Sequence, residues 1–279
     1  MRRVTIALLA LLFAPSAFAD DLSWFKAPPT VGVPVVNGWA GFYIGGQVGY
    51  SSANTDFSNS TQDPLAFVLR ELTLEAVQQP SSWPVLGSAT HSHASFGGFV
   101  GYNTQYEHLV LGVEANYNQA NLSLTAPNFP ISRLTSAGGN TYLVNITGSG
   151  TVTDLNFATL RARGGWAMGN FLPYAFGGLA VGHDNMHISA TVSGIENPQN
   201  QPCTPFPAPA TPACVPFSFT GTAGKNGEWL YGFTVGAGLD VALTKNVFLR
   251  GEYEFVQFAP VDKVQISVNT VRGGVAFKF

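Results

Sequence analysis

The stretch Trp39-Ala40-Gly41-Phe42-Tyr43-Ile44-Gly45-Gly46-Gln47-Val48-Gly49-Tyr50 decides the fold class of this chain. One side of an extended backbone carries Ala40, Phe42, Ile44, Gly46, Val48 and Tyr50. The other side carries Gly41, Tyr43, Gly45, Gln47 and Gly49. This period of two indicates a β-strand with two unlike faces. Trp39 and Tyr50 stand near the two ends of the strand, a position that suits the aromatic girdles of a membrane-spanning strand.

Seven further segments are expected to be strands of the same kind. They cover about 91–103, 108–121, 152–167, 171–183, 228–242, 247–258 and 265–279. In the segment 171–183 the pattern is weak, and its two faces stay unassigned. Short connections lie near 104–107, 168–170 and 244–246, and they alternate with mostly long ones. Long connections lie at 52–90, 122–151 and 184–227, and the last connection, near 259–264, is short. This alternation predicts tight periplasmic turns and long surface loops.

The composition narrows the fold class further. Hydrophobic residues make up 46% of the chain and charged residues only 10%, whereas a soluble domain carries roughly 25% charged residues. Beyond the first residues no apolar run is long enough for a transmembrane helix, so a closed β-barrel is the remaining way to cross a membrane. A soluble β-sandwich is the alternative, but it would place polar residues where this chain has Leu, Val and Phe. No basic tract is present, which argues against nucleic-acid binding.

The N-terminus predicts an export signal. Arg2 and Arg3 precede an apolar run, and Ala17-Phe18-Ala19 offers the small residues that a signal peptidase recognises. We therefore expect a signal peptide at 1–19, a proline-containing periplasmic linker at 20–38, and a barrel domain at 39–279 in the outer membrane. An uncleaved inner-membrane anchor is the alternative, although the apolar run is too short to span a bilayer.

Several motifs resemble one known family. Gly38–Gly46, Leu172-Pro173-Tyr174, Thr234–Leu239 and Arg250-Gly251-Glu252-Tyr253 are similar to strands of the outer-membrane immunogenic proteins, small porin-family barrels of Gram-negative bacteria. The resemblance implies an all-β fold, a transmembrane antiparallel eight-stranded up-and-down β-barrel with long extracellular loops at the cell surface. It implies no catalytic residues and no cofactor.

The chain end and the surface suggest partners. Phe277-Lys278-Phe279 resembles the aromatic-ended signal that the outer-membrane insertion machinery reads. Besides that machinery, we expect contacts with outer-membrane lipid and lipopolysaccharide, and with an unknown surface ligand through the loops.

Charged residues fall on the inward side of the predicted strands. Because an isolated buried charge is costly, they are expected to form an ion-pair network that fills the barrel interior, or lumen. Its predicted members are Glu114, Arg161, Arg163, Asp240, Arg250, Glu252, Glu254, Arg272 and Lys278. Residues equally far from the centre of a hairpin turn face each other across the two strands. The turn near Asp262 therefore places Glu252 opposite Arg272, and the turn at Lys245 places Asp240 opposite Arg250. Acid–base catalysis by Glu252 and Glu254 is the competing interpretation, but enzymes built on barrels usually carry their catalytic groups near the outer rim.

Four histidines raise the question of a metal or haem site. His91 and His93 share a face of one strand, as do His183 and His187 near the end of another, and alternate strand positions suit metal ligation. In a barrel of eight strands the two pairs would lie on strands that are not neighbours. We therefore expect solvated histidines at the rim and no metal site, with the metal or haem interpretation kept open.

Two of the expected loops carry local signals. Cys203 and Cys214 lie ten residues apart in a stretch rich in proline and alanine, and in an exported chain they predict a disulfide. Asp63 before Pro64 predicts a short helix with Asp63 as its N-cap. We expect that helix to pack as a lid over the barrel mouth.

These features predict a structural or surface-interaction protein of the outer membrane, with its loops as the contact surface. Eight strands enclose an interior that side chains can fill, which argues against free diffusion of solutes. A narrow diffusion channel is the second interpretation, and it requires that the glycine-rich inward faces leave a path for water. An enzyme acting at the outer rim is the third.

Overall fold

The computed structural model describes residues 38–197, 214–224 and 226–279. The predicted signal peptide, almost all of the predicted linker, and Cys203 lie outside the described residues. The elements are β1 (Gly41–Asp56), α1 (Gln62–Leu69), α2 (Thr73–Gln78), the 3-10 helix η1 (Pro80–Ser82), β2 (Ser88–Tyr106), β3 (Leu109–Thr125), β4 (Ile131–Ala137), β5 (Asn140–Trp166), β6 (Phe171–Asn197), β7 (Val215–Ala223), β8 (Asn226–Ala242), β9 (Val247–Phe258) and β10 (Gln265–Lys278). None of the described helices is long and apolar enough to cross a membrane.

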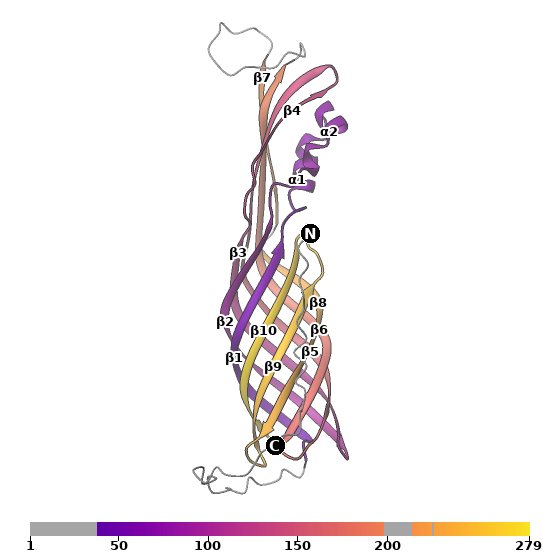
Figure 1. Ribbon diagram of the computed structural model, residues 1–279, viewed down its shortest axis with the longest axis vertical. Helices are drawn as coiled ribbons and strands as arrows, with labels where there is room; N and C mark the ends of the chain where they lie inside the picture. Colours follow the sequence, from indigo (N-terminus) through magenta and orange to yellow (C-terminus); the bar gives the residue numbers. More distant parts are fainter. Residues whose placement is uncertain (1–37, 198–213, 225) are drawn as a thin grey trace, which may run out of the picture. The chain divides into compact units, whose positions relative to one another are not determined.

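Eight antiparallel strands close into a barrel (Figure 1). Their order around the wall is β1-β2-β3-β5-β6-β8-β9-β10, and the ring is closed because β10 pairs with β1 and β5 pairs with β6. The predicted eight-stranded barrel is therefore confirmed. The tight turns at 107–108, 167–170 and 243–246 lie at one end with Phe279. We call this the turn end and the opposite end the loop end.

The two faces of each barrel strand differ as the alternation predicts. On β1, the outward Phe42 and Val48 are 64% and 68% exposed, whereas the inward Tyr43 is 1% exposed. The prediction for Trp39 is wrong. Its ring is buried against Phe248 and does not belong to the outward aromatic girdle. The backbone N–H of Trp39 donates to the Gln105 side chain, and the Asn103 side chain donates to the Trp39 carbonyl. These two bonds to β2 hold the Trp39 backbone at the turn end with its ring in the interior.

Inward glycines make room for inward aromatic rings. A Cβ atom at Gly101 would lie 2.3 Å from the Tyr43 hydroxyl oxygen, and one at Gly238 would lie 2.6 Å from the ring of Tyr174. Tyr174 and Phe176 both point inward from β6. Large apolar side chains on both faces of β6 explain why the sequence pattern left its faces unassigned.

The expected loops at 122–151 and 184–227 are largely β-structure, which corrects the sequence-based boundaries. β5 and β6 are each 27 residues long and continue together beyond the barrel, where β4 and β7 flank them in the order β4-β5-β6-β7. We call these four paired segments the outer sheet. Residues 140–153 of β5, at about 3.3 Å per residue, carry it roughly 45 Å from the barrel strands.

The segment between β1 and β2 covers one face of the outer sheet. Leu65, Leu69 and Leu74 from α1 and α2 are buried in one apolar cluster with Val144 and Ile188 from β5 and β6. The predicted helix is present, but its N-cap residue is Thr61, which places Asp63 in the first turn. α1 packs against β6 and β7, so the outer sheet with its helices has a core of its own.

Candidate functional site

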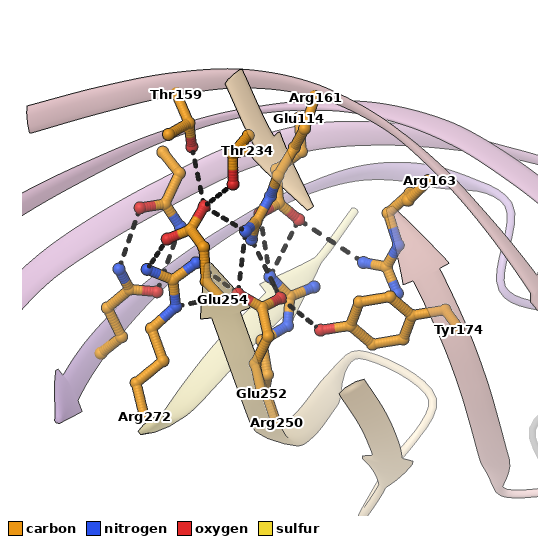
Figure 2. A network of polar contacts seen from close by, with 12 residues as sticks. Glu114, Thr159, Arg161, Arg163, Tyr174, Thr234, Arg250, Glu252, Glu254 and Arg272 are labelled. Atoms are coloured by element: carbon orange, nitrogen blue, oxygen red, sulfur yellow. Dashed lines mark hydrogen bonds and ion pairs between the residues drawn. The ribbon is translucent and has the colours of Figure 1, made fainter. Parts of the chain in front are cut away.

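Eight of the nine predicted lumen charges lie in one buried network inside the barrel. Figure 2 labels all of them except Asp240. They come from β3, β5, β8, β9 and β10, and each residue is at most 4% exposed. The network contains four carboxylates and four guanidinium groups, so its formal charge is zero. The members are Glu114, Asp240, Glu252, Glu254, Arg161, Arg163, Arg250 and Arg272.

Glu114 on β3 is the centre of the network. Its carboxylate accepts hydrogen bonds from Arg161 Nε at 3.1 Å, from Arg250 Nη1 at 2.8 Å and from the Tyr43 hydroxyl at 2.6 Å. Arg163 Nη1 approaches the same carboxylate at 3.5 Å. Charge-assisted bonds of this kind satisfy a carboxylate that has no access to bulk water.

Glu252 and Glu254 on β9 share two arginines. Glu252 lies directly opposite Arg272, as turn counting predicts, and accepts from Arg272 Nε at 2.8 Å. It also accepts from Arg161 Nη1 at 2.8 Å and from the Tyr174 hydroxyl at 2.6 Å. Glu254 pairs with Arg272 Nη1 at 2.7 Å. Each carboxylate is therefore held by two arginines, since Arg161 also approaches Glu254 at 3.3 Å.

The third part of the network is Asp240 on β8. It lies directly opposite Arg250, again as turn counting predicts, with Arg250 Nε at 2.9 Å and Arg163 Nη2 at 2.6 Å. Arg163 also lies over the Tyr174 ring at 3.8 Å, a cation–π contact. Lys278 corrects the prediction: it has no ion pair among the described residues, and its ammonium group donates to the carbonyl of Gly38 at the turn end.

Apolar side chains close the interior on both sides of the charges. At the turn end, Trp39, Tyr43, Phe99, Leu172 and Phe248 belong to one buried cluster, which we call the turn-end plug. On the loop-end side of the charges, a second buried cluster fills the interior, and we call its barrel residues the loop-end plug. These residues are Ala53, Leu155, Phe157, Ala180, Leu230, Val256, Phe258, Ile266 and Val268. The network therefore lies between two water-excluding layers.

The second notable surface is the face of the outer sheet that the helices leave open. Cross-strand register places hydroxyl side chains in rows, and Thr147, Thr191 and Thr220 form one row across β5, β6 and β7. Hydroxyl oxygens of the last two are 2.9 Å apart. At the barrel-side border of the face, Asp154 in the β5 bulge accepts a hydrogen bond from the Asn185 side chain at 3.4 Å. The other described positions of the face carry no Asp, Glu, Lys or Arg. We call it the hydroxyl face: Ser132, Ser136, Asn145, Thr147, Ser149, Thr151, Thr153, Asn185, His187, Ser189, Thr191, Ser193, Ser218, Thr220 and Thr222.

The tip of the outer sheet has a different chemistry on each face. On the open face, Leu134, Leu143, Ile195 and Pro216 form an apolar row that crosses all four strands. On the covered face, the Tyr142 hydroxyl donates to a glutamate of β6 at 3.0 Å, and burial raises the pKa of Tyr142.

The histidine pairs lie on two strands that are not neighbours in the sheet. His91 and His93 on β2 stack with ring centroids 6.4 Å apart. On β6, His183 packs edge-on against Trp229, and His187 lies opposite a threonine of β5. No set of three or more His, Cys, Asp or Glu within the described ranges is arranged to hold a metal ion.

Two predicted features stay predictions. The disulfide involves Cys203, which lies outside the described residues. Phe277 and Phe279 pack edge to face at the chain end, with centroids 5.2 Å apart, and their role as an insertion signal is untested.

Sequence reasoning missed the outer sheet and the hydroxyl groups of the network. Thr159 and Thr234 both donate to Glu254. Tyr43 and Tyr174 each donate a hydroxyl to a network carboxylate. Tyr43 falls on the inward side of the β1 alternation, so the pattern alone contained the signal for it. For the outer sheet, the alternation of Val144, Ile146 and Val152 with hydroxyl residues was the available signal.

Several known proteins are similar to this chain. The 31 kDa outer-membrane immunogenic protein of Brucella melitensis is 24% identical over 295 residues, covering 100% of both chains. The 25 kDa outer-membrane immunogenic protein of Brucella ovis is 22% identical and covers 100% of this chain and 98% of the relative. Among solved structures, Neisserial surface protein A covers 86% of this chain and 98% of its own, with 13% identity and a TM-score of 0.37. Ail of Yersinia pestis covers 86% of this chain and 99% of its own, with 13% identity and a TM-score of 0.31.

The decisive match is to a whole family. The family model described as "Outer membrane protein beta-barrel domain" matches residues 5–279, nearly the whole chain. The chain therefore belongs to the outer membrane protein β-barrel domain family, and it is an outer-membrane β-barrel protein.

Proposed function

We propose that this protein is a surface-interaction protein: a closed barrel that holds a folded module outside the cell and does not conduct solutes. The module consists of the outer sheet with α1, α2 and η1. In this proposal residues 1–19 are a cleaved signal peptide, the turn end faces the periplasm, and the module faces the medium of a Gram-negative cell. The insertion machinery and lipopolysaccharide are its partners in the membrane.

The observation that carries the proposal is the hydroxyl face. Rows of Thr147, Thr191 and Thr220 and their neighbours present hydroxyl groups without a formal charge. Such a face favours an uncharged partner bound by many hydrogen bonds, because a charged ligand would find no counter-charge in these rows; Asp154 lies at the border of the face, in the β5 bulge. The apolar row at the tip adds contact area that needs no charge either.

The barrel interior supports a role without transport or chemistry. A diffusion channel would need a water path past both plugs, and the residues that form them are buried. An enzyme would need an accessible acid or base. Glu252 and Glu254 are instead each held by two arginines, which favours a structural role for them.

The test compares binding by two matched double variants. Vesicles carrying the wild type are passed over immobilised neutral polysaccharides and extracellular-matrix proteins. Thr147→Lys with Thr220→Lys places two charges on the hydroxyl face, and Ala76→Lys with Val77→Lys places two charges on exposed positions of α2.

Vesicles carrying the wild type or the α2 variant should be retained equally. Vesicles carrying the hydroxyl-face variant should no longer be retained. The proposal also expects retention to change little between low and high ionic strength, since no charge pair would be screened. Equal retention of both variants, or binding abolished by salt, would contradict the proposal.

A further inference from the structure

The strand pairing of the barrel wall is interrupted at the loop end, between β2 and β3. The ladder between these strands ends at Phe96 opposite Gln119, and the two segments next pair at Leu86. In the intervening stretch, residues 88–95 of β2 pair with β1, and no strand pairing with β3 is present there. β3 has a bulge over the same stretch, in which Asn121 has a φ of 45°. One edge of β2 therefore has no paired strand over these residues.

His91 and His93 lie on this unpaired stretch of β2. Register places them opposite Ala53 and Ser51 of β1, whose side chains are fully buried on the inner face of the wall. The two histidines therefore share that face, yet both are exposed. Their exposure follows from the interruption, because no paired strand beside β2 covers them. The fold thus holds two imidazole groups in contact with solvent at the loop end.

The two imidazole rings lie side by side. They are nearly parallel, with an interplanar angle of 19° and ring centroids 6.4 Å apart. Nδ1 of His93 lies 2.8 Å from the backbone carbonyl oxygen of Ala94. Because a carbonyl oxygen only accepts hydrogen bonds, Nδ1 carries the proton and Nε2 keeps its lone pair. A hydrogen bond of this kind from one ring nitrogen fixes the tautomer and the orientation of metal-binding histidines.

We propose that His91 and His93 together bind one divalent transition-metal ion, with water completing its coordination. Metal–imidazole bonds of about 2.0–2.1 Å bring the two ligating nitrogens to about 3 Å from each other. The rings must tilt toward each other to reach that separation, and their exposure lets them do so without displacing a packed neighbour. Imidazole suits copper, zinc and nickel, and among the divalent first-row ions the affinity is highest for Cu²⁺. The expected ion is therefore Cu²⁺.

The other three histidines of the chain do not form such a pair. His183 and His187 are four positions apart on β6, which at about 3.3 Å per residue separates their Cα atoms by roughly 13 Å. His183 also packs edge-on against Trp229. His108 lies at the turn end, where its ring stacks on Trp166. The β6 pair is therefore a matched control, with two exposed imidazoles at the wrong spacing for one ion.

Calorimetry and electron paramagnetic resonance with Cu²⁺ test the proposal. The full-length mature protein, prepared without a polyhistidine tag and folded in detergent, is titrated with Cu²⁺ and, in a separate sample, with Zn²⁺. His91→Gln with His93→Gln removes the proposed ligands, and His183→Gln with His187→Gln removes the β6 pair. All four substitutions are at exposed positions, and a gel-mobility shift on heating shows that each variant is folded.

The wild type and the β6 variant should each bind one Cu²⁺ per chain at a site whose spectrum shows two coordinated nitrogens. His91→Gln alone and His93→Gln alone should each weaken binding at this site by about tenfold or more. The double variant on β2 should lose the two-nitrogen signal. Zn²⁺ should bind the wild type more weakly than Cu²⁺ does.

Three results would overturn the inference. Equal Cu²⁺ binding by the two double variants would show that the β2 pair is not the site. A wild-type spectrum with a single coordinated nitrogen would show that the two imidazoles do not share an ion. Loss of the two-nitrogen signal only in the β6 variant would place the site on β6. None of these readouts depends on binding by the hydroxyl face, so this inference and the proposed function fail separately.

Discussion

Replacing Arg272 with methionine removes one cation from a buried cluster whose charges cancel. Arg272 holds Glu252 through Nε at 2.8 Å and Glu254 through Nη1 at 2.7 Å. Glu252 keeps Arg161 and a tyrosine hydroxyl as partners. Without Arg272, the Oε1 atom of Glu254 keeps Arg161 and Thr234, but its Oε2 atom has no other partner among the described residues. The excess negative charge therefore falls mainly on the Glu254 carboxylate.

The size of the effect follows from the burial of these groups. Breaking a buried ion pair by removing one partner costs about 3–5 kcal/mol. The double variant Arg272→Met with Glu254→Gln restores zero net charge, and leaves only the cost of an imperfectly bonded polar group, about 1–3 kcal/mol. The double variant should therefore lose about 2 kcal/mol less stability than Arg272→Met alone. Because Glu254→Gln alone also costs stability, the expected coupling energy is at least about 2 kcal/mol in magnitude.

Urea unfolding in lipid vesicles, followed by tryptophan fluorescence, measures these free energies. Lys263→Met is the matched control, since it removes a cation from the exposed pair with Asp63 and should cost less than about 1 kcal/mol. A loss below that control for Arg272→Met would show that water reaches the cluster. Additive effects of the Arg272 and Glu254 substitutions would show that the two side chains do not interact.

Three further predictions test other parts of the account. Gly101→Ala should destabilise the barrel by about 1–3 kcal/mol, because the added methyl group meets a tyrosine ring. Gly251→Ala, with no atom within 4 Å of the new Cβ, should be tolerated in the same unfolding assay. Unreduced protein should show no free thiol, and replacing Cys203 and Cys214 by serine should leave membrane insertion intact; quantitative labelling before reduction would reject the disulfide. Phe279→Asp should slow assembly in cells while refolding into detergent proceeds normally, and an equal loss in both assays would mean that the aromatic end is structural rather than a signal.

The barrel was predictable from the sequence because each membrane-spanning strand has one face in lipid. The alternation of Phe42, Ile44 and Val48 with small or polar residues records that environment directly. Turn counting was equally reliable for Glu252 with Arg272, since the register across a short hairpin depends only on distance from the turn. The burial of Trp39 could not be predicted, because it depends on side chains of β2 that are distant in sequence.

The outer sheet was not predicted because its open face is polar and its strands contain glycine. Thr147, Gly148, Ser149 and Gly150 resemble a loop when taken alone. The alternation of Val144, Ile146 and Val152 with polar residues is a weak local signal for a strand. The pairing of β5 with β6, and the helices that cover Val144 and its neighbours, make the strand evident in the structure.

The claim that most needs testing is that the two plugs and the charge network close the interior. Single-channel recording in planar bilayers of the full-length mature protein, folded and shown to be heat-modifiable, tests it most directly. The expected result is no conductance steps above those of the protein-free bilayer. Regular, long-lived steps that scale with protein concentration would contradict it, and would establish the diffusion channel instead.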